Sequence, residues 1–194
     1  MVHLTQIYAV NVLFLCRLLL FSEICFEYKL TVAKEDEEKE VIEMGILNKN
    51  LVILDADVSS AEECIRKAGN LFFEYGYVAD GYVDEVLERE KVYPTGLPGK
   101  GISIAIPHTT NKLVNKPAIG VIIPRKPVQF AMMGTKDSML DCEIIMPLVI
   151  KDSNSQIATL RKLMHIIQDG ELLRKIRDSK NEDEVLDCLG MLED

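Results

Sequence analysis

Residues 101–110 read Gly101-Ile-Ser-Ile-Ala-Ile-Pro-His108-Thr109-Thr110. The three isoleucines alternate with Ser103 and Ala105, and this period of two places them on one face of a β-strand. Pro107 has no backbone N–H, so strand pairing should end there. The pattern predicts a short strand that delivers His108 to the loop at its end, where α/β sheets usually place their chemistry.

The position of His108 leaves several roles open. An imidazole in such a loop can act as an acid, a base, a metal ligand or a nucleophile, and it can also simply satisfy a loop carbonyl. The other histidines are His3 and His165, and no histidine lies at metal-ligand spacing from a second histidine or from a cysteine. Walker-type and G-x-G-x-x-G loops are absent as well. We therefore expect neither a metal nor a cofactor.

Composition narrows the class of protein further. The chain has 194 residues, of which 48% are hydrophobic and 27% charged. This composition is typical of a globular domain, and the length suits one domain with an additional segment. Its formal charge of −9 argues against a nucleic-acid partner, because no basic patch would offset the phosphates. The five cysteines show no C-x-x-C spacing, which is typical of free thiols in a reducing compartment. We expect a cytoplasmic protein.

The first 43 residues form an extension with a different character. Residues 4–26 are strongly apolar but are interrupted by Arg17, and residues 33–43 are rich in lysine and glutamate. Three hypotheses remain for this extension: an upstream stretch before a true start at Met44, a weak membrane anchor, or a helix that packs on the domain. We expect the functional domain to comprise residues 44–194.

From Met44 onward, helical and strand patterns follow one another. The apolar residues 51–54 predict a strand, and Ser59 and Ser60 with Glu62 and Glu63 have the spacing of a helix start. That helix should end near Gly76, and Asp80 can cap a second helix that ends around residue 90. Continuous apolar runs at 118–123 and 144–150 predict strands covered on both faces, with a short strand at 128–130 between them.

The C-terminal part has helical periodicity. From Ser155 onward, an inward stripe is expected to consist of Ile157, Leu160, Leu163, Met164 and Ile167, and Ser179 should open a last helix that buries Val185, Leu186 and Leu189. Two helices, several strands and two or three helices together predict an α/β fold: a single domain with a mixed β-sheet flanked by helices.

Four further residues are candidates for a site around His108. Arg89 stands at a helix end, where a cation suits the helix dipole, but its guanidinium also matches the oxygens of an anion. Thr95 and Thr109 add hydroxyl donors on the loops that flank the strand. Gln156 shares the azimuth of Ile157, Leu160 and Met164, so it should point inward, either to buried backbone or to the site. His165 projects to the other side and is expected to be an exposed residue.

These residues carry a family resemblance. The order Leu87-Glu-Arg89-Glu, Pro94-Thr95-Gly96, Gly101-Ile-Ser-Ile-Ala-Ile-Pro107-His108 and Gln156-Ile-Ala-Thr-Leu160 resembles the fructose/mannitol-type (type-2) IIA domain of the bacterial sugar phosphotransferase system. The resemblance extends from about Leu51 to the C-terminus. Many members have a second histidine where this chain has Gln156, and in this respect the chain is most similar to the galactitol-type branch.

The resemblance implies a phosphocarrier with a phosphohistidine intermediate. His108 would accept a phosphoryl group from phospho-HPr and pass it to a cysteine of a IIB component, which works with a IIC permease. Arg89 would hold the phosphate, and Gln156 and a threonine hydroxyl would donate neutral hydrogen bonds to it, with Thr95 and Thr109 as the candidate threonines. No metal or cofactor is implied. The alternative is a regulatory, nitrogen-type IIA protein that signals by its phosphorylation state through protein binding.

Overall fold

The computed structural model describes residues 46–135, 137–150 and 153–192, without the side chains of residues 111, 153–159 and 191. The hypotheses on residues 1–43 concern a segment outside these ranges. The elements follow one another along the chain as β1 (Leu47–Ala56), α2 (Ala61–Glu74), α3 (Tyr82–Val92), β2 (Gly96–Pro98), β3 (Ser103–Ala105), η1 (Asn111–Leu113), β4 (Ala118–Pro124), β5 (Val128–Ala131), β6 (Met139–Ile145), β7 (Leu148–Val149), α4 (Ser153–Gln168), α5 (Gly170–Asp178), α6 (Glu182–Leu189) and η2 (Gly190–Leu192). None of the helices in the described ranges is long and apolar enough to span a bilayer.

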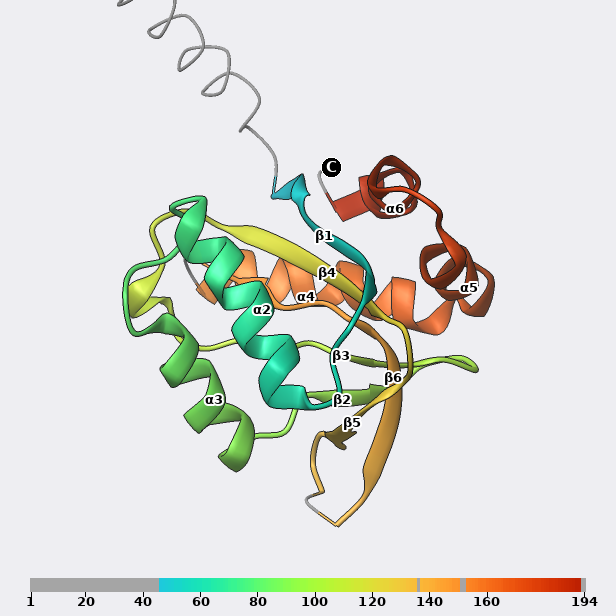
Figure 1. Ribbon diagram of the computed structural model, residues 1–194, viewed down its shortest axis with the longest axis horizontal. Helices are drawn as coiled ribbons and strands as arrows, with labels where there is room; N and C mark the ends of the chain where they lie inside the picture. The colour runs from blue at the N-terminus through green and yellow to red at the C-terminus, as the bar shows by residue number, and fades with distance from the viewer. Residues whose placement is uncertain (1–45, 136, 151–152, 193–194) are drawn as a thin grey trace, which may run out of the picture. The chain divides into compact units, whose positions relative to one another are not determined.

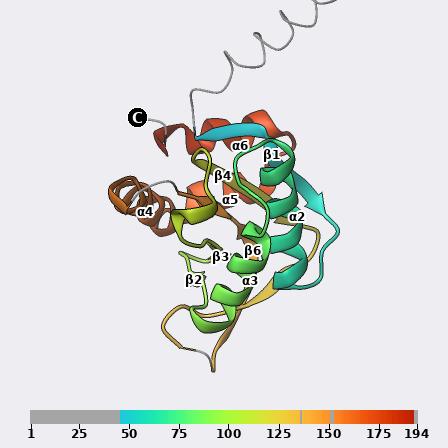
Figure 2. The ribbon, with the colours of Figure 1, turned by 90° about the vertical axis from the view of Figure 1, so that its left-hand side faces the viewer.

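The strands form one mixed sheet in the order β1-β4-β6-β3-β2, with β5 paired to β6 and β7 paired to β4. The pairs β1–β4 and β3–β6 are parallel, whereas β2–β3 and β4–β6 are antiparallel. Helices cover both faces: α2 and α3 lie side by side on one (Figure 1), and α4, α5 and α6 pack on the other (Figure 2). The predicted α/β domain with a mixed sheet is confirmed.

Two apolar clusters fill the spaces between these layers, and the strand patterns explain which residue enters which cluster. Ile102, Ile104 and Ile106 belong to the cluster under α4, α5 and α6, while Ala105 belongs to the cluster under α2 and α3. The period of two at residues 102–106 is therefore confirmed, although both faces of the strand are buried. β4 is buried along nearly its whole length, as its continuous apolar run predicts.

Helix starts follow the expected chemistry in one case and depart from it in two. The Ser60 side chain accepts the Glu63 N–H at 3.2 Å, so the predicted start of α2 is confirmed. The prediction for α3 was wrong, because Gly81 with φ of +85°, not Asp80, is its N-cap. The prediction for α6 was also wrong: Asn181 accepts the Glu184 N–H at 3.0 Å, while Ser179 ends the helix before it.

Two packing predictions also need correction. The apolar run 144–150 is not one strand, because Met146 and Pro147 separate β6 from β7. Met164 is 43% exposed and does not belong to the buried stripe of α4, which contains Leu163, Ile166 and Ile167. A helix on a flat sheet buries a narrow face, and Met164 lies just past its edge.

Candidate active site

His108 lies directly after β3, where Pro107 ends the strand. The Pro107 carbonyl still accepts the Leu148 N–H at 2.9 Å, and His108 is bridged to Leu148 in parallel. This pairing holds the backbone of His108 against β7 and leaves only 6% of the residue exposed. The histidine is thus fixed by the sheet at the end of a strand, in the position that the alternation of residues 101–110 predicts.

One hydrogen bond sets the tautomer of the His108 ring. Nδ1 lies 2.7 Å from the carbonyl oxygen of Ile106. A carbonyl oxygen only accepts hydrogen bonds, so Nδ1 must carry the proton and donate. In the neutral ring, Nε2 then holds the free lone pair. The residue two positions earlier therefore prepares Nε2 as a nucleophile.

The surroundings of His108 also keep the ring neutral. Burial lowers the pKa of His108 below its ordinary value, and the positive charge of Arg89 lowers it further, against the bond to Ile106, which raises it. An imidazole that stays uncharged near neutral pH keeps its lone pair available.

Arg89 lies in the last turn of α3, and its guanidinium can still donate hydrogen bonds. Its Cζ atom is 5.8 Å from the ring centroid of Tyr93, which fixes one side of the group by a cation–π contact. Its Nη1 atom is buried and has no hydrogen-bond partner; no other buried side-chain nitrogen or oxygen of the described residues lacks one. An unpartnered buried donor is costly, so this N–H is available to an acceptor such as an anionic oxygen.

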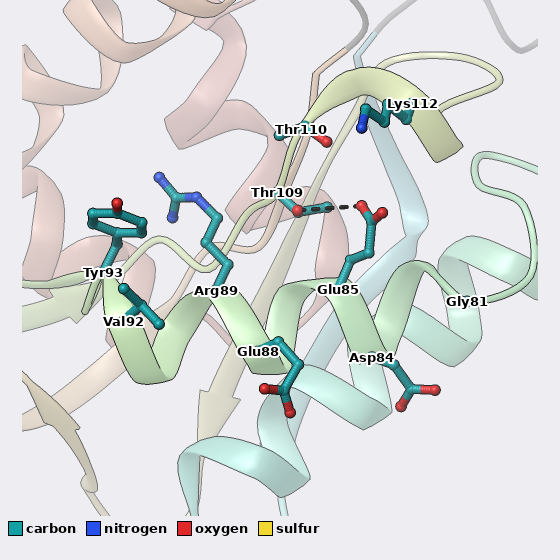
Figure 3. Close-up of a pocket in the computed structure, with 10 residues that line it drawn as sticks. All are labelled: Gly81, Asp84, Glu85, Glu88, Arg89, Val92, Tyr93, Thr109, Thr110 and Lys112. Carbon is teal, nitrogen blue, oxygen red and sulfur yellow. Dashed lines mark hydrogen bonds between the residues drawn. The ribbon is translucent and has the colours of Figure 1, made fainter.

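A pocket of about 640 Å³ opens beside these groups, between α3 and the segment after His108. Figure 3 shows Glu85 and Arg89 on the same side of α3, Glu85 pointing to Thr109 and the Arg89 guanidinium lying near Tyr93, while Asp84 and Glu88 point the other way. The hydroxyl of Thr109 lies 3.5 Å from a Glu85 carboxylate oxygen, at the long limit of a hydrogen bond. The lining thus has Arg89 on one side and Lys112 on the other, with the hydroxyl groups of Thr109 and Thr110 and the carboxylate of Glu85 between them.

The structure brings some of the predicted site residues together and gives one of them a different partner. Arg89 and Thr109 line the pocket, and His108 directly precedes Thr109 and is close enough to Arg89 to be affected by its charge, although it is not itself a lining residue. Thr95 is fully buried, and its hydroxyl donates to the Glu90 carboxylate at 2.8 Å. Gln156 belongs to the first turn of α4, with its side chain outside the described part. His165 is exposed, as expected.

Sequence reasoning left the carbonyl partner of the His108 ring unidentified and missed Glu90. The Ile106 carbonyl sets the tautomer of His108, and Glu90 holds Thr95 through both its backbone N–H and its hydroxyl. Glu90 belongs to the Glu-Arg-Glu segment that contains Arg89. A carboxylate directly beside this candidate arginine was the feature of the sequence that could have pointed to Glu90. Among the residues that the structure describes, no group of three His, Cys, Asp or Glu side chains is arranged to hold a metal ion.

Comparison with known proteins agrees with this geometry. The chain is 30% identical over 161 residues to the mannitol-specific EIICBA component of Vibrio cholerae, which covers 81% of this chain and 24% of that protein. The chain thus spans about a quarter of that relative's length. It is also 30% identical to the mannitol-specific enzyme IIA component of Geobacillus stearothermophilus, over 75% of this chain and 96% of that one.

Solved structures give the same result. The complex of enzyme IIA-mannitol with phosphorylated enzyme IIB-mannitol from Escherichia coli contains a chain that is 26% identical, with a TM-score of 0.62 over 74% of this chain and 96% of that one. The nitrogen regulatory protein IIA-Ntr from Neisseria meningitidis is 25% identical, also with a TM-score of 0.62, over 74% and 96% of the two chains.

The family model decides the assignment. The model described as "Phosphoenolpyruvate-dependent sugar phosphotransferase system, EIIA 2" matches residues 45–190, and this range contains the His108 segment, Arg89 and the helices on both faces of the sheet. The resemblance that the sequence motifs carry is therefore confirmed, and the chain belongs to the type-2 EIIA family of the phosphoenolpyruvate-dependent sugar phosphotransferase system.

Proposed function

We propose that residues 44–194 act in the cytoplasm as a phosphocarrier of sugar or polyol uptake. His108 accepts a phosphoryl group from phospho-HPr and passes it to a cysteine of a IIB component that serves a IIC permease. The complex of IIA-mannitol with phosphorylated IIB supports an acceptor of the IIB kind. The relatives described above are named for mannitol, whereas the galactitol-like assignment rests on Gln156 alone.

The proposed transfer needs two displacements at phosphorus. In the first, the Nε2 lone pair of His108 attacks the phosphorus, the P–N bond of the donor phosphohistidine breaks, and the donor ring nitrogen keeps the electron pair. In the second, a IIB thiolate attacks, the P–Nε2 bond breaks, and the electron pair returns to Nε2. The protein contributes position and charge compensation, which is what phosphoryl transfer mainly requires.

The proposal is carried by one observation: a histidine whose tautomer frees Nε2 lies near a buried guanidinium nitrogen that lacks an acceptor. A phosphoryl group on Nε2 would bring three oxygens to Arg89, and guanidinium–phosphate hydrogen bonds are among the strong ones. Thr109 at the pocket wall and Gln156 at the start of α4 would donate further hydrogen bonds.

The test is phosphotransfer to the full chain from phosphoenolpyruvate through enzyme I and HPr, followed by intact mass. We expect one acid-labile phosphate that is absent in His108→Ala. A folded wild-type chain that takes up no phosphate would contradict the proposal.

The alternative, a regulatory nitrogen-type protein, is favoured by the likeness to IIA-Ntr, which is as close in fold as the mannitol-type chain. The two functions share His108 and differ in the acceptor. Transfer of phosphate onward to the cysteine of a IIB protein supports the carrier. Stable phosphorylation with no transfer to mannitol-type or galactitol-type IIB proteins would favour the regulatory function.

A further inference from the structure

We propose that Glu90 is a positioning residue for His108, acting through Thr95 and the backbone of Ile106. The inference rests on the proposed function, since it concerns how the nucleophile is held for transfer. It also gives Thr95 a role other than direct contact with phosphate.

Three consecutive contacts connect Glu90 to the imidazole. The Glu90 carboxylate accepts the Thr95 N–H at 2.9 Å and the Thr95 hydroxyl at 2.8 Å. The Thr95 carbonyl then accepts the Ile106 N–H at 3.2 Å. Finally, the Ile106 carbonyl accepts the His108 Nδ1–H at 2.7 Å. Glu90 uses both carboxylate oxygens on Thr95, and Thr95 and Ile106 each use the backbone N–H toward one neighbour of the path and the carbonyl toward the other.

The location of Glu90 explains why these contacts matter. Thr95 immediately precedes β2, which pairs with β3 from Gly96 opposite Ala105 to Pro98 opposite Ser103. Past Ala105 the ladder ends, so the single bond from Ile106 to Thr95 continues it toward His108. The carboxylate of Glu90, by holding Thr95, therefore fixes the end of the β2–β3 ladder that lies next to His108.

Glu90 is half-buried, which is a costly environment for a carboxylate, and its contacts offset part of that cost. Burial raises the pKa of the Glu90 carboxyl, while the two bonds from Thr95 and the charge of neighbouring Arg89 lower it. A carboxylate that is removed from water needs such donors. Because Glu90 and Arg89 are adjacent in α3, the same helix also sets where the guanidinium stands relative to His108.

The experiment uses the full chain with Glu90→Gln, Thr95→Val and Thr95→Ser. Thr95→Val removes the hydroxyl but keeps the size and the N–H, whereas Thr95→Ser retains the hydroxyl. Single-turnover phosphorylation by phospho-HPr gives the rate at saturation and the half-saturating donor concentration. The ¹⁵N shifts of the His108 ring, measured without donor, give the fraction of molecules with the proton on Nδ1.

We expect Glu90→Gln and Thr95→Val to lower the saturated rate roughly tenfold, less than the 100-fold that a misplacement of about 1 Å can cause. The half-saturating concentration should stay the same, the Nδ1–H fraction should fall, and Thr95→Ser should restore both readouts. The matched control is Glu63→Gln, because Glu63 likewise accepts the N–H and the hydroxyl of one residue, Ser59, but at the start of α2. It should change neither readout.

Two results would overturn the inference. If the Thr95 hydroxyl contacts the phosphate directly, Thr95→Val will lower the saturated rate, whereas Glu90→Gln will leave the rate unchanged. The ring tautomer will then be the same in both variants as in the wild-type protein. If Glu63→Gln and Glu90→Gln change the rate and the Nδ1–H fraction equally, Glu90 only stabilises the fold and does not position His108. The ring measurement needs no donor, so it decides the inference even if wild-type protein takes up no phosphate and the proposed function fails.

Discussion

At the scale of single residues, the protonation of His108 is set by its neighbours, and this gives a prediction on pH. Burial, and to a smaller degree Arg89, lowers the pKa of His108 below the ordinary 6.5. An NMR titration of the His108 ring should therefore have a midpoint below 6.5. In Arg89→Ala the midpoint should rise, because the positive charge of Arg89 disfavours the protonated form of His108 and is removed in this variant. A His108 midpoint that is the same in the wild-type protein and in Arg89→Ala would contradict the prediction.

The same shift has a consequence for stability whose sign can be worked out. The unfolded chain has the ordinary pKa, so between the two pKa values it binds more protons at this residue than the folded chain does. Stability from His108 is therefore fully present above the unfolded value and is lost as the pH falls through the folded one. Replacing His108 with Gln should flatten the dependence of the free energy of unfolding on pH in this window.

A second residue-scale prediction compares the two phosphate contacts under the proposed function. Arg89 carries a charge and a buried unpartnered N–H, whereas Gln156 is neutral. Arg89→Ala should slow single-turnover transfer roughly 100-fold, the size found on losing one preorganised donor to a developing charge. Gln156→Ala should cost clearly less, since neutral hydrogen bonds are about half as strong. Comparable losses would contradict this ranking.

At the scale of elements, the crossing of α2 and α3 positions Arg89. Gly69 in α2 lies against Val83 in α3, and a Cβ on Gly69 would stand 2.5 Å from Val83 Cγ2. Gly69→Ala should therefore destabilise the fold by about 1–3 kcal/mol, despite the better helix propensity of alanine. Adding Val83→Ala should recover part of this loss, because it removes the clashing methyl groups. Urea unfolding of both single variants and the double variant measures the coupling, and strictly additive effects would exclude the contact.

The elements also show what sequence could and could not predict. Strand patterns at 102–106 and 118–123 and the start of α2 at Ser60 follow from local rules, and the structure agrees with them. Ser179 and Asn181 are both good N-cap residue types, so local rules do not separate them; in the structure Ser179 ends α5 and Asn181 caps α6. Local chemistry ranks the candidates for a helix start, but tertiary contacts choose one.

At the scale of the whole molecule, local chemistry identifies some residues of the site, and tertiary contacts determine the others. His108 and Arg89 could be proposed from motifs because their chemistry is visible in the residue type. The clamp of Glu90 on Thr95 could not, because it depends on how the end of α3 approaches β2. Backbone partners such as the Ile106 carbonyl are available at every residue, so no sequence pattern identifies the one that binds an imidazole.

The layered core gives a last prediction. Cys64 in α2 and Cys142 in β6 are completely buried in the cluster between the sheet and the α2–α3 layer, and burial raises the pKa of both thiols to about 12. Cys188 in α6 is partly exposed. Burial also raises the pKa of the Cys188 thiol, but reagent can reach this side chain in the folded protein. At pH 8 iodoacetamide should therefore modify Cys188 before Cys64 and Cys142, which react only as fast as the layers separate.

Peptide mapping by mass spectrometry distinguishes these sites. If the layers separate only on global unfolding, Cys64 and Cys142 should react at one common rate that rises together with urea. Reaction of Cys64 well ahead of Cys142 would mean that α2 detaches while the sheet stays intact. Because α2 packs on α3, such local opening would also free the helix that carries Arg89 and Glu90, and the site would then be held less firmly than these contacts imply.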